Sequence, residues 1–254
     1  MNYIVLDMEW NQPWPGSPSA KKVLPVAIRG EIIQVGAVRL DERGGPGDEF
    51  QVMIVPKYYR HLNRRVSKLT GIKEARLRAE GVPFPEAMEQ FHAWCGQDPV
   101  FLTWGFDDIG ILRENLELFS LDRGWTEKWY NVQMIFNAQT DGSSSQKALK
   151  TAMEAFHIEA SRPAHDALGD AYHTALICQR LDLATCADHG KFLIRVRLSA
   201  QPDGTIRVSR LTYEATSEAA EAYARRAQKA EPEAPRRSRR RRRRTGTKKE
   251  AEQS

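Results

Sequence analysis

The chain has 254 residues, of which 41% are hydrophobic, enough for one substantial core and a smaller appendage. No apolar run reaches the roughly 18 to 20 residues of a membrane span, and no basic segment followed by an apolar one stands at the N-terminus. We therefore expect a cytoplasmic protein without a membrane partner. Cys95, Cys178 and Cys186 show neither a paired framework nor metal-ligand spacing, so we expect them to be reduced and buried.

The net charge of +5 is unevenly distributed along the chain. Residues 225–254 hold 13 Lys and Arg against 4 Asp and Glu, which leaves 25 against 29 for residues 1–224. Eight of the nine positions from Arg236 to Arg244 are arginine, and such a run cannot form a core. We expect residues 230–254 to be disordered and to bind nucleic acid through counterion release. A solubility tail or a targeting signal is the alternative.

The first predicted element is a strand over residues 2–7, which is apolar on both faces and therefore central in a sheet. It runs into Asp7 and Glu9, whose i, i+2 spacing places both carboxylates on one side. Two such carboxylates repel each other unless one is protonated or a cation lies between them, and oxygen ligands favour Mg²⁺ or Mn²⁺. An ordinary strand that ends in an acidic loop is the alternative.

An antiparallel meander is predicted next. A proline-rich loop covers residues 10–25, and strands follow at 31–40 and 49–55. A turn rich in Gly and Asp joins these two strands at 41–48. We expect a loop or a short helix at 67–72.

The middle of the chain predicts alternating helices and strands. An amphipathic helix follows Pro83, and a short strand covers 99–103. A further helix begins at Asp107 or Asp108, where a carboxylate can cap free amides. Residues 130–134 are interpreted as a fifth strand.

The last helices of this region are predicted over residues 143–156 and from about Pro163 onward. In the second, Asp170, Thr174 and Ile177 fall at i, i+4 and i+7, so Asp170 would face the sheet. An inward carboxylate is costly unless it meets a cation. Strands that alternate with helices favour an α/β layered fold with a mixed sheet.

Four motifs now show a resemblance to the DEDDh branch of the DnaQ-like, RNase T-type 3′-to-5′ exonucleases: Asp7-Met-Glu9, Leu69-Thr-Gly-Ile72, Trp104-Gly-Phe-Asp-Asp108 and His165-x4-Asp170. The likeness covers residues 1–183 and is closest to the enhanced-RNAi and KinA-pathway-inhibitor type. It implies a ribonuclease H-like fold with a mixed five-stranded sheet flanked by helices, two divalent metal ions, Mg²⁺ or Mn²⁺, and hydrolysis of nucleic acid from the 3′ end.

The resemblance also implies roles for individual residues. It makes His165 catalytic and makes metal ligands of Asp7, Glu9, Asp108 and Asp170. Asp108 is preferred to Asp107 because the subfamily places its ligand four residues after the tryptophan of this motif.

Nucleotide contacts are expected around the first two motifs. The candidates are Met8, Trp10, Asn11, Leu69, Thr70 and Trp104. Core packing is the alternative for Trp10 and Trp104 and is preferred for Trp94. The proline-rich insert at residues 10–30 departs from the family pattern and leaves the shape of the substrate entrance open.

The same site can be argued from chemistry. Cleavage of a phosphodiester by water needs an activated water, neutralisation of charge on phosphorus and help for the leaving oxygen, all of which paired divalent ions assist. Four carboxylates suit such ions, and imidazole suits the removal of the water's proton near neutral pH. His157 and His173 have no partner at motif spacing and are expected to be structural or exposed.

The resemblance fades after Leu183. Residues 191–198 and 205–211 predict a β-hairpin across a Pro-Asp-Gly turn, with basic residues Arg195, Arg197, Arg207 and Arg210. Such a hairpin either packs on the nuclease core or contacts RNA, and a helix is predicted at 217–229. The expected organisation is an exonuclease domain at 1–183, a hairpin and helix at 184–229, and the tail at 230–254.

Three functions follow, in order of preference. The first is a metal-dependent 3′-to-5′ exoribonuclease that acts on single-stranded, structured or ribosome-associated RNA. The second is a DNA 3′-to-5′ exonuclease for trimming or proofreading. The third is a catalytically silent nucleic-acid-binding regulator on the same fold. Clustered acids count against the third, because a scaffold does not need uncompensated charge. The oligomeric state is not predicted.

Overall fold

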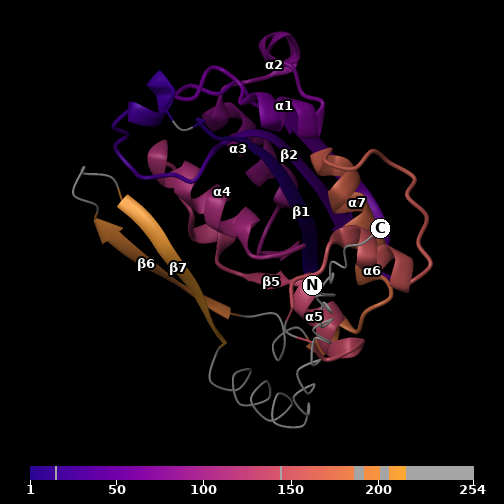
Figure 1. Ribbon diagram of the computed structural model, residues 1–254. Coiled ribbons are helices and arrows are strands. Elements are labelled where there is room, and N and C mark those ends of the chain that lie inside the picture. The colour runs from indigo at the N-terminus through magenta and orange to yellow at the C-terminus, as the bar shows by residue number, and fades with distance from the viewer. Residues whose placement is uncertain (15, 144, 186–191, 201–205, 216–254) are drawn as a thin grey trace, which may run out of the picture.

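The computed structural model describes residues 1–14, 16–143, 145–185, 192–200 and 206–215, the last two ranges as backbone only. Five strands form a mixed sheet in the order β3-β2-β1-β4-β5 (Figure 1). Their bounds are β1 Asn2–Asn11, β2 Glu31–Leu40, β3 Pro46–Met53, β4 Pro99–Thr103 and β5 Trp129–Asn131. The pairs β1–β2 and β2–β3 are antiparallel, whereas β1–β4 and β4–β5 are parallel. The predicted mixed five-stranded sheet flanked by helices is confirmed.

Strand β1 is central because both of its faces are covered by helices. Ile4, Leu6 and Met8 belong to the hydrophobic cluster that includes α3 (Phe84–Cys95) and α4 (Asp107–Leu118). Val5 belongs to the opposite cluster, built with α5 (Val132–Gln139), α6 (Leu149–Ala155) and α7 (Ala167–Cys178). Since side chains alternate along a strand, Asp7 and Glu9 share the Val5 side and face α7. Figure 1 shows α4 and α7 on either side of β1.

Several elements differ from their predicted bounds. Strand β1 continues past the acidic pair to Asn11, with a register shift between Glu9 and Trp10. The predicted strand at 130–134 is wrong in its second half, because the Asn131 side chain accepts a hydrogen bond from the Met134 amide (3.3 Å) and starts α5. Helix α6 begins at Leu149, later than the predicted 143.

Two short helices follow the meander. Helix α1 (Arg64–Thr70) extends the segment expected at 67–72 toward the N-terminus, and α2 (Glu74–Glu80) was not predicted. Gly71 ends α1 with φ 74°, a left-handed conformation that glycine adopts readily. Three 3-10 turns complete the described elements: Pro18–Lys21 in the insert, Gly124–Thr126 and Leu183–Thr185.

The C-terminal hairpin is a separate two-stranded sheet. Strands β6 (Phe192–Ala200) and β7 (Ile206–Ala215) pair antiparallel, which confirms the hairpin prediction. The predicted helix at 217–229, the tail at 230–254 and Cys186 lie outside the described residues. The domain boundaries stay predictions. Cys95 and Cys178 are buried, as expected. Among the described helices, none is both long and apolar enough to cross a lipid bilayer.

Candidate active site

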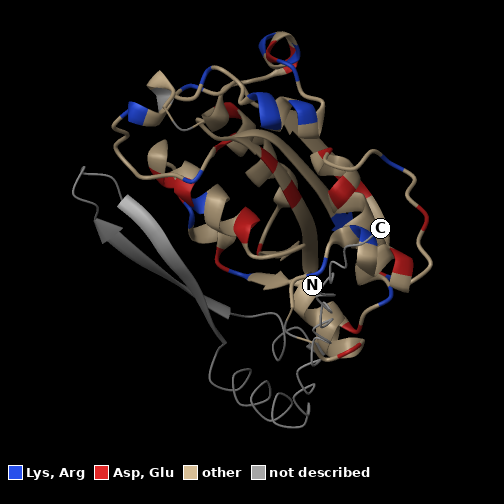
Figure 2. Cartoon of the chain, in the orientation of Figure 1, with Lys and Arg blue, Asp and Glu red and all other residues tan. Residues whose placement is uncertain are grey.

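A cavity of about 490 Å³ lies where β1 passes the starts of α4 and α7. It brings together side chains that are far apart in the sequence. Of the residues expected at the site, the cavity is lined by Asp7, Met8, Glu9, Trp10, Leu69, Thr70, Trp104, Asp108, His165 and Asp170. All the predicted acids and the predicted histidine therefore share one pocket. Figure 2 shows acidic residues, in red, on the sheet and on its flanking helices.

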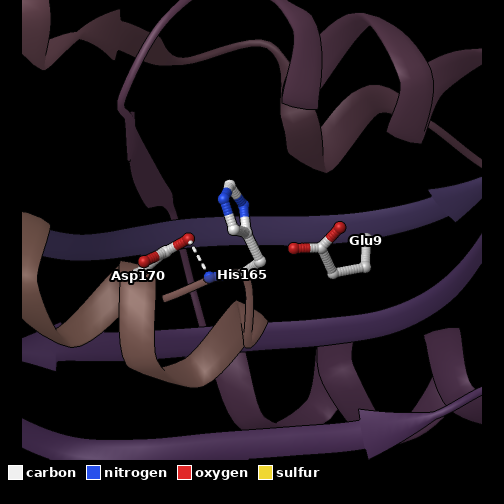
Figure 3. Close-up of side chains that lie close together, drawn as sticks. All are labelled: Glu9, His165 and Asp170. Carbon is white, nitrogen blue, oxygen red and sulfur yellow. Dashed lines mark hydrogen bonds between the residues drawn. The ribbon is translucent and has the colours of Figure 1, made fainter. Parts of the chain in front are cut away.

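Three of these side chains lie within reach of a single ion. Glu9, His165 and Asp170 each offer a ligand atom, and these atoms all lie within 4.8 Å of one another (Figure 3). Glu9 comes from β1, whereas Asp170 lies in the first turn of α7. Carboxylate oxygens beside an imidazole form a donor set suited to a divalent cation.

His165 has an unusual backbone conformation. Its φ is 59°, in the left-handed region that residues other than glycine seldom adopt. Its amide donates a hydrogen bond to Asp170 Oδ2 (3.0 Å), which ties the loop before α7 to the helix. The imidazole is exposed and lies between Asp170 and Glu9 in Figure 3. The ring is therefore accessible to a bound ligand while its backbone is held by the site.

Asp107 and Asp108 are adjacent in the sequence but differ in their surroundings. Asp108 is 6% exposed, and its Oδ1 accepts a hydrogen bond from the Met8 amide (3.2 Å). The Asp107 side chain is 54% exposed and pairs with Arg29 Nη1 (2.6 Å). Both carboxylates lie in the first turn of α4, whose N-cap position is Phe106. This placement agrees with the preference for Asp108 as a ligand.

Burial and nearby negative charges raise the pKa values of the clustered carboxylates. Burial raises the pKa of Asp7 well above its usual value, and the charges of Asp108, Asp170 and Glu9 add to this. Burial, followed by the charges of Asp170 and Asp108, raises the pKa of Glu9 to about 8. The pKa of Asp108 rises to about 7, chiefly through burial, and burial also raises that of Asp170. Such a cluster favours protons or a divalent cation as its neutralising partner.

The start of α7 is seated directly on β2. Gly36 pairs with Asp7, and a Cβ built at Gly36 would lie 2.1 Å from the Leu168 nitrogen and 2.2 Å from the Ala167 carbonyl carbon. Only glycine allows this approach. The sequence analysis missed this residue, although a glycine inside a strand is itself a sign of close backbone contact.

Two polar residues fix the same helix end. Gln34 Nε2 donates to Asp166 Oδ1 (2.7 Å), while the Ala167 amide donates to Gln34 Oε1 (3.2 Å). Asp166 Oδ2 accepts from the Gly169 amide (3.1 Å) and so caps the helix. Both residues were missed. For Asp166 a signal was available, because Asp directly before a predicted helix is a preferred N-cap.

The residues expected to contact nucleotides differ in what they offer. Leu69 is 53% exposed at the rim of the cavity, and Trp10 is partly buried. The Thr70 hydroxyl donates to Val66 O (3.0 Å) and accepts from the Ile72 amide (3.1 Å), so it is used in closing α1.

Met8 and Trp104 line the cavity but also belong to the core. Met8 is 2% exposed, and its side chain packs in the α3 and α4 cluster, so its role in binding substrate stays a prediction. Trp104 donates from Nε1 to Lys147 O (3.0 Å) and packs against the α5 side. Both interpretations made for Trp104 are therefore compatible with its placement.

Asn11 does not line the cavity, and the expected nucleotide contact is corrected. The residue is fully buried. Its Nδ2 donates to Tyr59 O (2.7 Å) and His61 O (2.9 Å), and its Oδ1 accepts from the Asn63 amide (2.9 Å). Asn11 thus positions the loop that leads into α1.

The structure places His157, His173 and Trp94 as expected. His173 is buried, accepts a hydrogen bond at Nε2 from the Ser161 amide (3.2 Å), and has its pKa lowered by burial. His157 is exposed. Trp94 packs against the core and donates from Nε1 to Asp48 (2.8 Å).

Comparisons with known proteins agree with this arrangement. The RNase T family model, described as "Exonuclease", matches residues 4–178. The chain belongs to this family, which confirms the predicted class of enzyme, an exonuclease that hydrolyses phosphodiester bonds of nucleic acid. Enzymes of this family depend on divalent metal ions. Among curated protein sequences, none matches the chain.

Solved structures share the fold at low sequence identity. The nuclease domain of 3′hExo, a DEDDh family member bound to rAMP, is 23% identical over 70% of this chain and 90% of that one, with a TM-score of 0.60. A 3′-exonuclease that recognises the histone mRNA stem-loop is 20% identical over 85% and 73%, with a TM-score of 0.63. E. coli exonuclease I in complex with a dA16 oligonucleotide is 19% identical over 73% and 41%, with a TM-score of 0.53. The likeness to the enhanced-RNAi and KinA-pathway-inhibitor type stays a prediction.

Proposed function

We propose that this chain is a 3′-to-5′ exoribonuclease that uses two divalent ions, Mg²⁺ or Mn²⁺, and His165 as general base. The observation that carries the proposal is the convergence of Asp7, Glu9, Asp108 and Asp170 beside His165 in one cavity. Their raised pKa values mean that the ionised carboxylates are unfavourable without a neutralising partner. A hard divalent cation would be such a partner.

In the proposed reaction, the four carboxylates and His165 have different roles. The four carboxylates would hold the metal ions, which when bound supply charge neutralisation on the phosphate and activation of water. His165, exposed at the rim of the acids, takes the proton from the attacking water. The oxygen of that water forms a new bond to phosphorus, the bond to the 3′ oxygen of the preceding nucleotide breaks, and a nucleoside 5′-monophosphate leaves.

RNA is proposed as the substrate class because of the subfamily likeness and the arginine-rich tail at 230–254. We propose that this tail adds affinity for structured or ribosome-associated RNA in the cytoplasm. The similarity to 3′hExo bound to rAMP is consistent with this choice. DNA is the second candidate, favoured by the similarity to exonuclease I in complex with an oligodeoxynucleotide.

Matched single strands of RNA and DNA, each labelled at the 5′ end, test the proposal with Mg²⁺, with Mn²⁺ and with EDTA. The expected result is a ladder that shortens from the 3′ end, faster for RNA, present with either metal and absent with EDTA. Asp7→Ala should abolish it. Full activity of the Asp7→Ala protein, or activity that survives EDTA, would contradict the proposed site.

Deletion of residues 230–254 separates the tail from the chemistry. It should raise KM for a long RNA at low salt and leave kcat within about twofold, because counterion release acts on binding. The difference from the full chain should shrink as salt rises.

A further inference from the structure

A second cavity continues from the active-site cavity along α1. Its volume is about 660 Å³. We call it the Trp14 groove, and it is lined by Trp14, Leu62, Asn63, Arg64, Arg65 and Lys68. Asn63 and Arg65 also line the active-site cavity, so the two cavities share a wall. The exposed side chain of Leu69 stands on the active-site side of this junction.

One wall of the groove is the proline-rich insert, and the other is α1. Trp14 is 44% exposed, so much of its indole is accessible to a ligand. The insert is fixed to the start of α1 because Asn63 Nδ2 donates to Gln12 O (3.1 Å). The Ser17 amide donates to Trp14 O (3.1 Å), which closes a turn behind the indole. The indole is therefore presented by a braced segment.

The α1 wall carries uncompensated positive charge. Arg64, Arg65 and Lys68 are exposed, and within the described part of the chain no carboxylate lies at ion-pair distance from them. The neighbouring helix α2 differs, because Arg76 pairs with Glu80 (2.9 Å) and Arg78 with Glu74 (3.3 Å). Figure 2 shows the basic residues on α1 without red beside them, and mixed red and blue on α2.

We propose that the Trp14 groove binds the single strand that precedes the terminal nucleotide of the substrate, with the indole stacked on a base and Arg64 and Lys68 against phosphates. This inference rests on the proposed function, because the strand must deliver its 3′ end to the acids. An exposed aromatic beside cations is the combination that holds single strands without sequence preference. Bases within a duplex stack on their neighbours on both faces, whereas an unstacked base of a single strand offers a face to the indole, so the occupant is a single strand.

Two substrates of different length distinguish the contribution of the Trp14 groove from that of the catalytic acids. A nitrophenyl ester of thymidine 5′-monophosphate occupies only the terminal position, whereas a 12-nucleotide single strand reaches past it. In the full chain, Trp14→Ala should lower kcat/KM on the 12-nucleotide strand about tenfold, chiefly through KM, because loss of one stacked base weakens binding by about that factor. Hydrolysis of the ester should stay within twofold.

Conservative and matched variants sharpen the result. Trp14→Phe keeps a stacking face and should retain most of the activity on the strand. Val23→Ala removes another exposed apolar side chain of the same insert, 97% exposed, and should change nothing. Thermal unfolding of each variant shows whether the fold is intact.

The cations have their own test. Arg64→Ala with Lys68→Ala should make the dependence of log kcat/KM on log salt shallower by about 1.4, since each phosphate contact on a single strand contributes about 0.7. Arg76→Ala with Arg78→Ala removes the same charge from α2 and should leave the salt dependence unchanged.

The outcomes distinguish the two levels of the proposal. If Trp14→Ala left the 12-nucleotide strand unaffected, or slowed strand and ester equally, the groove would not be the path of the substrate. Equal salt effects of the α1 and α2 variants would overturn the role of Arg64 and Lys68. A wild-type chain that cleaves neither substrate would overturn the proposed function, and the groove as a substrate path with it.

Discussion

Helices α4 and α7 each bring one aspartate to the acid pair of β1, but they are held there by different means. The start of α4 is tied by side chains: Arg29 from the insert pairs with Asp107 (2.6 Å) and Glu114 (2.7 Å). The start of α7 rests on bare backbone at Gly36, with Gln34 and Asp166 as polar links. Side-chain ties can shift and re-form, whereas backbone contact cannot. The position of Asp170 should therefore tolerate far less change than the surroundings of Asp108.

The largest effect is expected at the ligand itself. Asp108→Asn should lower kcat about a thousandfold, because a lost metal ligand removes several kcal/mol of charge stabilisation in the transition state. Asp107→Asn should cost less than tenfold, since that carboxylate is exposed and paired with Arg29. Single-turnover rates with saturating Mn²⁺ measure both. Similar losses of kcat in the two variants would contradict the assignment of Asp108, and not Asp107, as the metal ligand.

The next effect concerns the seat of α7. Gly36→Ala places a methyl group against the Ala167 and Leu168 backbone, which must move away from Asp7. A displacement of about 1 Å can cost on the order of a hundredfold in rate, and overpacking costs about 1 to 3 kcal/mol of stability. Activity and the free energy of unfolding should therefore fall together.

Gly110 of α4 provides the matched control. A Cβ there would also be close to another atom, 2.2 Å from Arg29 Nη2, but that atom ends a flexible side chain. Gly110→Ala should cost less than threefold in activity. A Gly36→Ala protein as active as Gly110→Ala would refute the contrast between the two helix seats.

A smaller effect should follow from pH in the metal-free protein. Glu9 has a folded pKa of about 8 against an ordinary value of 4.5, so the folded state binds more protons between these values. Stability then falls as pH rises through this window. We expect the melting temperature of the EDTA-treated chain to drop by about 5 °C from pH 5 to pH 8, and Mg²⁺ to restore it.

Glu9→Gln isolates this contribution from histidine titration, because it keeps the shape and removes the charge. The variant should lose part of the pH-dependent decrease seen in the wild-type chain. Identical pH profiles for the two proteins would show that Glu9 does not carry the excess charge of the cluster.

The smallest effect is expected at the insert's tie to α4. Arg29→Ala removes the pairs with Asp107 and Glu114, in which all three side chains are at least 27% exposed. Pairs of this kind contribute about 0 to 1 kcal/mol each. Activity should fall no more than about threefold, since the Met8 amide still binds Asp108. A loss comparable to that of Gly36→Ala would mean that the insert is part of the catalytic scaffold.

Local patterns carried much of the fold. The apolar run that ends at Asp7 and Glu9 predicted the central strand, and the helical spacing around Asp170 predicted that its side chain faces the sheet. Each of these patterns spans only a few residues of the sequence. The prediction at 130–134 was wrong in part, because a short apolar run fits either a strand or a helix. The Asn131 side chain caps a helix here, so the strand ends at that residue. A glycine within a strand can mark a close backbone contact, but the local pattern around Gly36 does not identify Leu168 as its partner.

The site was predicted more fully than its supports. The resemblance to DEDDh exonucleases gave the five residues that line the cavity and are proposed for catalysis. Asn11 was misplaced because its neighbour Trp10 faces the cavity while Asn11 itself is buried under the loop at 59–63. Gln34 could not be predicted because its role depends on Asp166, 132 positions away, whereas Asp166 had a local signal as an N-cap residue.

A calorimetric titration of the EDTA-stripped chain with Mn²⁺, beside the same titration of Asp7→Asn, tests the central claim most directly, because it detects the ions independently of any substrate. The account predicts two ions bound per wild-type chain and clear loss of binding in Asp7→Asn. Equal binding by both proteins, or none by the wild-type chain, would contradict the claim that these carboxylates form a metal site.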